Sequence, residues 1–306
     1  MDQDEAIVAQ RTRVLITSTA DGSDQPCYLT HSEGFDSRSG LTPLVLVLHP
    51  WSSGVEHRQE SFEAEAIRRD WILLVPHFRG RNDHPDACGS IKAQQDILDA
   101  VEWAKIRFDV DPRRVYLTGA SGGGHMTMLM ASRHPTVWAA ASAWVGISDL
   151  SAWHQRHEEA EYGEMLRKVC GGRPGDSKRV DTEYRQRSPL TFLHRAARVP
   201  LDIAAGIHDG HQGSVPIRHS LEAFNETAKA SGDTVIAESE ITQLSAENGR
   251  LTAPHESDLV EDETLGRAIY LRRHSAFSRV TIFEGGHEGI STAAFDWLSR
   301  HIKPEA

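Results

Sequence analysis

A glycine-rich stretch surrounds a serine whose neighbours suit nucleophilic chemistry. Residues 119–123, Gly-Ala-Ser-Gly-Gly, fit the pattern G-x-S-x-G and stand between an apolar run and a helical stretch. The glycines permit a sharp turn that holds the serine hydroxyl away from a sheet, and the N-terminus of the next helix favours negative charge there. The pattern therefore predicts Ser121 as a nucleophile. A serine that only caps the helix is the structural alternative.

A serine hydroxyl needs a base, and the chain offers 17 histidines among which position must select. His287 follows the last apolar run, in Phe-Glu-Gly-Gly-His-Glu-Gly, and the glycines on both sides leave its ring room to reach the serine. We expect His287 to be the general base. His125 lies on the predicted helix that follows Ser121. We expect it to be packed and hydrogen-bonded, and a role as base or ligand is the alternative.

The third residue of such a site is an acid that orients the histidine and offsets its charge. Two aspartates, Asp149 and Asp209, follow predicted strands between the serine and the histidine. The order serine, acid, histidine, with the acid after the later strand, favours Asp209, whereas Asp149 is more typical of a residue that fixes a loop or caps a helix. His208 and His211 flank Asp209, but no third ligand stands at a suitable spacing. We therefore expect neither a metal nor a cofactor.

Acyl transfer also requires two hydrogen-bond donors for the oxyanion of its intermediate. We expect one donor to be the backbone N–H of Gly122, directly after the serine. The other should come from the loop at 49–54, His-Pro-Trp-Ser-Ser-Gly, after the third apolar run. Pro50 has no N–H to donate. The sequence therefore predicts Trp51 as the second donor, with Ser52 as the alternative.

The elements that must position these residues follow from the alternation of apolar runs with amphipathic stretches, which is typical of βαβ units. The run Leu44-Val-Leu-Val-Leu48 suits a parallel strand covered on both faces. The expected strands span residues 12–19, 26–30, 44–48, 71–75, 115–118, 138–145, 199–205 and 279–283, and the expected helices include about 58–69, 97–108, 214–230 and 290–301. We expect Asp111-Pro112 to end the second of these helices. The predicted fold class is α/β, with a mostly parallel central sheet flanked by helices.

Two stretches depart from this alternation. Residues from about 151 to 195 are charged and dotted with aromatics, which predicts a helical insertion after the sixth strand. Residues from about 237 to 267 are polar with little periodicity, which predicts a long excursion. No repeat or linker divides the chain, so we expect a single domain over 1–306, with the insertion and the excursion near the active site.

Composition argues against several function classes. The formal net charge of −11 disfavours nucleic acid as a partner. No apolar run approaches the roughly 20 residues of a membrane-spanning helix. The acidic start, Met1 to Glu5, lacks the order of a secretory leader, so we expect a cytoplasmic protein. We expect Cys27, Cys88 and Cys170 to be buried thiols, with a Cys88–Cys170 disulfide as the alternative.

Taken together, these motifs resemble the catalytic domain of prolyl-oligopeptidase-like serine hydrolases and related esterases, over roughly residues 40–300. The segments that carry the resemblance are Pro76-His-Phe-Arg-Gly80, Asp111-Pro-Arg-Arg-Val115, Gly119-Ala-Ser-Gly-Gly123, Arg187-Ser-Pro-Leu190, Pro200-Leu-Asp-Ile203, Gly206-Ile-His-Asp209, Val215-Pro216 and Gly286-His287. The resemblance implies an α/β-hydrolase fold. It places the family's serine, acid and histidine on Ser121, Asp209 and His287, in agreement with the choice made from the residues alone.

The chain departs from the family pattern at two places. The peptidases of the family usually carry a bulky aromatic residue after the serine, where this chain has Gly122. The family's His-Gly-Gly loop reads His49-Pro50-Trp51 here. Both changes touch the floor of the acyl site and the oxyanion donors, so peptidase activity does not carry over from the resemblance.

Three functions fit these features. The first is an ester hydrolase that forms an acyl-enzyme from small or sugar-linked esters, with Trp153 and Arg79 as substrate-binding residues. The second is a serine peptidase with the same triad, in which short peptides would contact Arg79, Arg81, Glu158, Glu159 or Glu161; a solvated helix face is the alternative for these glutamates. The third is a non-enzymatic binding protein on a hydrolase scaffold, which an intact triad disfavours. The sequence leaves the oligomeric state open.

Overall fold

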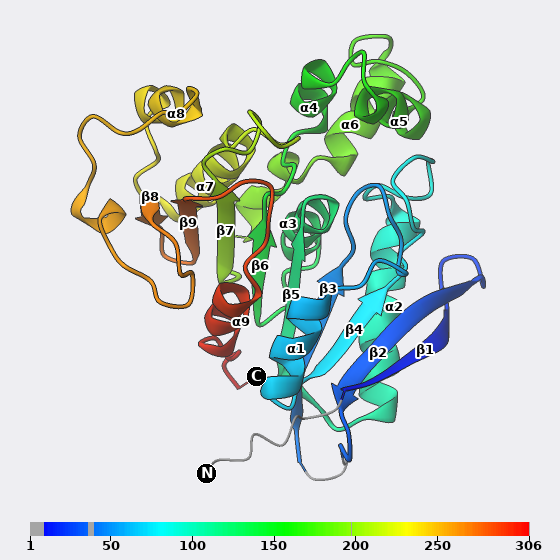
Figure 1. Ribbon diagram of the computed structural model, residues 1–306. Helices are drawn as coiled ribbons and strands as arrows, with labels where there is room; N and C mark the ends of the chain where they lie inside the picture. The colour runs from blue at the N-terminus through cyan, green and yellow to red at the C-terminus, as the bar shows by residue number, and fades with distance from the viewer. Residues whose placement is uncertain (1–8, 36–39, 197, 306) are drawn as a thin grey trace.

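The computed structural model describes residues 9–35, 40–196 and 198–305. Within them, one sheet contains nine strands in the order β1-β2-β4-β3-β5-β6-β7-β9-β8 (Figure 1). The strands from β4 to β9 in this order run parallel, whereas β1, β2 and β8 are antiparallel additions at the edges. The strands are β1 (Ala9–Thr17), β2 (Asp24–Ser32), β3 (Thr42–Leu48), β4 (Ile72–Pro76), β5 (Val110–Ala120), β6 (Ala140–Trp144), β7 (Leu201–Gly206), β8 (Ile269–His274) and β9 (Ser278–Phe283).

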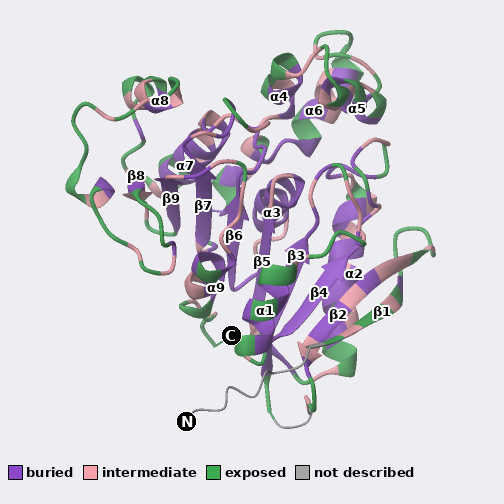
Figure 2. Cartoon of the chain, in the orientation of Figure 1, coloured by how far each residue is buried: buried purple, intermediate pink, exposed green. Residues whose placement is uncertain are grey.

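Helices cover both faces of this sheet (Figure 1). One face carries α1 (Glu60–Arg68) and α9 (Ser291–Ser299), and the other carries α2 (Ile91–Arg107), α3 (Gly122–Arg133) and α7 (Arg218–Ser231). Strands β3, β4, β6, β7 and β9 are buried along their whole length (Figure 2). Parallel strands covered in this way have no solvent side, which is why β3 and β4 contain unbroken apolar runs. The predicted α/β class with a mostly parallel central sheet is confirmed.

The parallel strands bring distant parts of the chain to one edge of the sheet. Strands β5, β7 and β9 end at Ala120, Gly206 and Phe283. Because parallel strands end on the same side, the loops that follow them lie together. The candidate residues Ser121, Asp209 and His287 come from these three loops.

The helical insertion predicted after the sixth strand is present above this edge of the sheet (Figure 1). It consists of α4 (Leu150–Arg156), α5 (Glu161–Cys170), α6 (Lys178–Arg187) and two 3₁₀ turns, η1 (Pro189–Thr191) and η2 (Leu193–Ala196). The excursion contains α8 (Glu238–Ser245) and η3 (Glu256–Asp258) and lies beside β8 at the sheet edge (Figure 1).

Two local predictions are wrong. Strand β8 is absent from the expected strands. Its sequence, Ile-Tyr-Leu-Arg-Arg-His, contains two arginines and a histidine, so it lacks the apolar run that predicts a strand in the sheet interior. Its arginines pair with acids of the excursion: the buried Arg272 with Asp262 at 2.9 Å, and the partly buried Arg273 with Asp258. Asp111-Pro112 lies within β5 rather than at a helix end. The pairing of β3 with β5 shifts register there, so the missing N–H of proline interrupts no ladder bond.

The three cysteines are buried thiols, as the sequence predicts. Cys27, Cys88 and Cys170 are all free, so the alternative disulfide does not form. In the described part of the chain, no helix has the length and apolarity to cross a bilayer. The acidic start lies outside the described residues. The single-domain organisation is a proposal, which the continuous sheet supports.

Candidate active site

The nucleophile turn is a strained connection between β5 and α3. Ser121 has a φ of 60°, in the left-handed region that residues other than glycine rarely adopt. Its backbone N–H donates to the Trp144 carbonyl at 2.9 Å. A Cβ at Gly119 would lie 2.7 Å from the carbonyl carbon of Gly123, so the turn closes only with glycine at the first position of G-x-S-x-G. The sharp turn expected from the motif is therefore present.

The structure joins the candidate base to the candidate acid. His287 Nδ1 lies 2.7 Å from Asp209 Oδ2. The other oxygen, Asp209 Oδ1, accepts the backbone N–H groups of Gly210 and Val215, each at 3.0 Å. Asp209 therefore acts as an acceptor on both oxygens, as a carboxylate does, and holds the ring with Nδ1 as donor and Nε2 as acceptor. Asp149 instead caps α4 by accepting the N–H of Ser151 at 2.8 Å.

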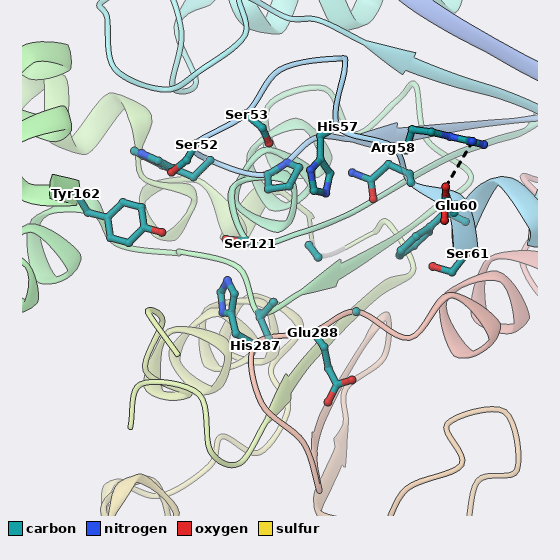
Figure 3. A pocket seen from close by; sticks show the side chains of 17 residues that line it. Ser52, Ser53, His57, Arg58, Glu60, Ser61, Ser121, Tyr162, His287 and Glu288 are labelled. Atoms are coloured by element: carbon teal, nitrogen blue, oxygen red, sulfur yellow. Dashed lines mark ion pairs between the residues drawn. The ribbon is translucent and has the colours of Figure 1, made fainter. Parts of the chain in front are cut away.

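Ser121 and His287 line one pocket of about 690 Å³ (Figure 3). They reach it from opposite sides, Ser121 from the turn before α3 and His287 from the loop after β9. Asp209 lies outside this pocket, with its side chain fully buried behind the histidine. The pocket thus presents one hydroxyl and one imidazole to a substrate and keeps the carboxylate away from it.

The two expected oxyanion donors lie against each other. A Cβ at Gly122 would overlap the backbone N and Cα of Trp51, so only glycine allows the loop after β3 to approach the nucleophile turn this closely. Among the described residues, neither the Trp51 N–H nor the Gly122 N–H has a hydrogen-bond acceptor.

The remaining pocket walls combine apolar side chains, such as Pro50 and Phe62, with polar and charged ones. Neutral hydrogen-bonding side chains come from Ser52, Ser53, Gln59, Ser61 and Tyr162. Arg58 lies in the wall between two carboxylates, 3.4 Å from Glu60 and 2.6 Å from Glu63. The only wall residue from the insertion is Tyr162, and the excursion contributes none in the described part of the chain. Ser245 of the excursion instead lines a second pocket together with Asp209, so the expected position of the excursion near the active site stays a proposal.

The two predicted substrate-binding residues lie elsewhere. Trp153 is buried behind Trp51, with ring centroids 4.7 Å apart, and donates its indole N–H to the Ser214 carbonyl at 2.9 Å. It supports the pocket wall without lining it. Arg79 pairs with Asp21 and Asp96, both at 2.7 Å. It ties the β1–β2 hairpin to α2, and its pKa is raised by these two hydrogen-bonded carboxylates.

The other histidines near the motifs have structural partners. His125 is buried with Nε2 2.8 Å from the Arg187 carbonyl, and burial lowers its pKa to about 4. It is the packed, hydrogen-bonded residue expected from the sequence. His208 contacts Glu284 at 2.8 Å, and His211 contacts the Ser245 carbonyl at 3.2 Å. Across the described residues, no three His, Cys, Asp or Glu side chains gather in a metal-binding arrangement.

Three site residues escaped the sequence analysis. Gly213 packs on the acid–base pair, because a Cβ there would overlap Asp209 Oδ1 and lie 2.8 Å from the His287 Cβ. Val145 lines the pocket beside the serine, and Tyr162 enters it from the insertion. A glycine four residues after the acid was a usable signal for Gly213. Nothing in the local sequence marks Val145 or Tyr162.

Comparison with known proteins places this architecture in a family. The sequence pattern of the prolyl oligopeptidase family matches residues 62–238, which is more than half of the chain. This chain belongs to the prolyl oligopeptidase family. It is therefore a serine hydrolase by family, and whether it cleaves esters or peptides is a separate question.

Its relatives include proteins named as peptidases and as esterases. An uncharacterized peptidase of Bacillus subtilis is 26% identical over 153 residues, 49% of this chain and 55% of that protein. An acetylxylan esterase of Coprinopsis cinerea is 40% identical over 50 residues, 16% of this chain and 13% of the esterase. The chain thus spans about half, or less, of these relatives.

Solved structures agree on the fold. The acylaminoacyl peptidase of Pyrococcus horikoshii superposes with a TM-score of 0.61 at 17% sequence identity, over 76% of this chain and 37% of that chain. A Leishmania major oligopeptidase B structure gives a TM-score of 0.62 at 12% identity, over 95% of this chain and 35% of the other. At these identities the likeness supports the fold alone.

Proposed function

We propose that this chain hydrolyses small acyl esters through Ser121, His287 and Asp209. The observation that carries the proposal is the pocket that Ser121 and His287 both line, with Asp209 Oδ2 2.7 Å from the Nδ1 of that histidine. This arrangement has each part of a nucleophile, base and acid site, on three separate loops.

In the proposed acylation step, Ser121 Oγ attacks the acyl carbon and His287 Nε2 takes its proton. The Asp209 carboxylate stabilises the imidazolium that forms. The N–H groups of Trp51 and Gly122 donate to the oxyanion, a role that the close approach of the two residues supports. The intermediate collapses when the ester C–O bond breaks and the leaving alkoxide takes the proton from His287.

Deacylation repeats these steps with water in place of the serine. Water adds to the acyl carbon of the Ser121 ester while His287 takes one of its protons. The second tetrahedral intermediate breaks its bond to Ser121 Oγ, which recovers the proton from His287. The products are the free acid, the alcohol and the starting enzyme.

The position of the charged side chains supports esters over peptides. A peptidase that reads a chain terminus needs a carboxylate or cation in its pocket to pair with it. The charged side chains expected for that role do not line the pocket that contains Ser121 and His287, namely Arg79, Arg81, Glu158, Glu159 and Glu161. Neutral hydroxyl and amide groups of Ser52, Ser53, Gln59 and Ser61 line the same pocket, and such groups suit the hydroxyl-rich leaving group of a sugar-linked ester.

A serine peptidase is the second candidate. It is favoured by the carboxylates of Glu60 and Glu288 among the pocket walls, because either could meet the amino group of a short peptide. Glu288 points away from Ser121, however (Figure 3), and lies 3.4 Å from Arg267. This geometry ranks the peptidase below the esterase.

A small substrate panel tests the proposal. We would measure hydrolysis of p-nitrophenyl acetate, butyrate and octanoate beside prolyl, alanyl and arginyl p-nitroanilides, using wild type, Ser121→Ala and His287→Ala. We expect ester turnover that disappears in both variants, with the anilides untouched. Anilide turnover that disappears in both variants would favour the peptidase. Turnover that survives Ser121→Ala would overturn the assignment of the nucleophile.

A further inference from the structure

Four buried polar side chains form a chain of hydrogen bonds across neighbouring strands of the sheet. Arg279 Nε on β9 donates to Asp202 Oδ1 on β7 at 2.8 Å. Ser142 Oγ on β6 donates to Asp202 Oδ2 at 2.9 Å, and the indole N–H of Trp144 donates to Ser142 Oγ at 2.8 Å. We call Arg279, Asp202, Ser142 and Trp144 the buried ladder. Ser142, Asp202 and Arg279 are direct cross-strand partners, so the ladder follows the register of the sheet.

The buried ladder fixes the orientation of one large side chain. Its ion pair is almost fully buried, with side-chain exposures of 9% for Arg279 and 1% for Asp202. Such a pair is weak evidence for stability, because desolvation offsets the attraction of the charges. It does give specificity, since Asp202 directs the Ser142 hydroxyl and leaves its oxygen to accept the Trp144 indole. Phe283 packs against the same indole, with ring centroids 5.8 Å apart.

The ladder ends at the nucleophile turn. The carbonyl of Trp144 accepts the backbone N–H of Ser121 at 2.9 Å. The same oxygen lies so close to α3 that a Cβ at Gly124 would overlap it. The N–H of the same peptide group, contributed by Val145, donates to the Ala204 carbonyl at 2.7 Å. This peptide group is therefore held at both ends, and one of its partners is the nucleophile.

Val145, which contributes the N–H of that peptide group, and Ser121, which donates to its carbonyl, both have strained backbones. Val145 has a φ of 43° and Ser121 a φ of 60°, each in the left-handed region. For a β-branched residue this conformation is a genuine outlier, which persists only where the surroundings enforce it. The surroundings here are the two hydrogen bonds of the peptide group and the Trp144 side chain that the ladder holds.

We propose that the buried ladder positions the nucleophile, with Ser142 and Trp144 as positioning residues that act on Ser121 through the Trp144 carbonyl. Neither residue has a role in bond making. Loosening the indole lets the Trp144–Val145 peptide group relax toward an unstrained conformation, and the Ser121 turn then loses its anchor. The inference rests on the proposed nucleophile but is independent of whether the substrate is an ester or a peptide.

The test is the rate at which diisopropyl fluorophosphate inactivates the enzyme. In this reaction Ser121 Oγ attacks phosphorus, the P–F bond breaks, fluoride leaves, and His287 takes the hydroxyl proton. We expect Ser142→Ala and Trp144→Phe each to lower the second-order rate constant at least tenfold. The matched control is Ser132→Ala, because it removes a buried hydroxyl from α3 that bonds only to the helix carbonyls of Met128 and Leu129. This control should react within twofold of wild type.

A pH profile separates positioning from a disturbed base. The midpoint of the rate against pH should stay in place in Ser142→Ala and Trp144→Phe, because neither touches the His287–Asp209 pair. Rates within twofold of wild type in folded variants, or a displaced midpoint, would overturn the inference. If Ser142→Ala fails to fold, Trp144→Phe decides the question, since it keeps an aromatic ring and removes only the donor and part of the indole. A wild type that does not react would overturn the proposed function itself, and this inference with it.

Discussion

The nucleophile turn and the rim of the pocket enclose the same cavity, but they are held by different forces. At the turn, backbone contacts decide the geometry: Ser121 is bonded to the Trp144 carbonyl, and Gly122 is packed against Trp51. At the rim, exposed side chains decide it, as in the Arg58–Glu60 pair, whose side chains are 52% and 73% exposed. Exposed ion pairs contribute little energy and rearrange easily, whereas a backbone contact in a close-packed interior does not.

This difference teaches which part of the function is fixed. The groups proposed to make and break bonds are Ser121, His287, Asp209 and the backbone of Trp51 and Gly122, which we call the floor of the site. The floor is closely packed and tolerates almost no change in volume. The groups that would contact the rest of the substrate lie on the rim, where substitutions cost little stability. We therefore expect the pocket walls, more than the nucleophile turn, to decide between ester and peptide substrates.

The largest expected effect is on the buried acid of the floor. Asp209→Asn should lower kcat by about 10⁴-fold with little change in KM, because an amide no longer selects the required tautomer of His287. The matched control is Asp149→Asn, in which the second candidate acid loses its charge and keeps its capping oxygen. Steady-state kinetics on p-nitrophenyl acetate measures both. Equal losses in the two variants would contradict the assignment of the acid.

The next effect concerns the contact between the two oxyanion donors. Gly122→Ala should lower kcat by about 10²- to 10³-fold, the loss typical of one oxyanion donor, because its methyl group displaces the Trp51 backbone. Gly286→Ala is the matched control, since a Cβ at Gly286 meets nothing within 4 Å although it precedes His287. Kinetics of both variants on one ester decides the point. Full activity in Gly122→Ala would mean that Trp51 is not a donor.

Low pH should lower the free energy of unfolding, because two buried histidines are neutral in the folded chain. Burial lowers the pKa of both His125 and His219 to about 4 from an ordinary value of 6.5. The unfolded chain binds protons below about pH 6.5 that the folded chain refuses, so stability is present above that pH and is lost as pH falls toward 4. Each histidine accounts for at most about 3 kcal/mol over this window.

Urea unfolding at pH 7, 6 and 5 measures this loss. His125→Gln should reduce the pH dependence, because an amide does not titrate and can still donate to the Arg187 carbonyl. The exposed His255 provides the control, and His255→Gln should leave the dependence unchanged. A free energy of unfolding that stays constant from pH 7 to pH 5 would contradict burial of these two rings in the neutral form.

The smallest expected effect is on the rim. Arg58→Ala should change KM by about two- to fivefold and leave kcat within twofold, because the exposed pair with Glu60 is worth less than about 1 kcal/mol and Arg11 still pairs with the buried Glu63. Arg68→Ala is the matched control, as Arg68 lies on α1 with an exposed side chain outside the pocket. A large loss of kcat in Arg58→Ala would mean that this residue takes part in bond making, and would contradict the distinction between floor and rim.

The fold and the floor could be predicted from sequence because their signals are local. The unbroken run at 44–48 indicates a covered parallel strand, and the glycines around Ser121 indicate a sharp turn whatever lies elsewhere. Both aspartates fall between the serine and the histidine, so the position after the later strand selects Asp209 over Asp149, and the hydrogen bond between His287 and Asp209 agrees with that choice.

The walls could not be predicted because their side chains find partners far away in the chain. Arg79 pairs with Asp21, which is 58 residues distant, and the Trp153 indole bonds to Ser214, which is 61 residues distant. An arginine and a tryptophan are residue types that often contact substrates. Only the tertiary contacts show that these two side chains do not line the pocket. Strand β8 was missed for the same reason, because the acids that make its arginines compatible with burial come from the excursion.

The central claim is that one serine, Ser121, is the nucleophile. Its most direct test is to label the enzyme with one equivalent of diisopropyl fluorophosphate and to map the adduct by mass spectrometry of its peptides. We predict a single diisopropylphosphoryl group on the peptide that contains Ser121, with hydrolytic activity lost in proportion to labelling and no adduct in Ser121→Ala. An adduct on another residue, or full activity in the labelled enzyme, would contradict the account.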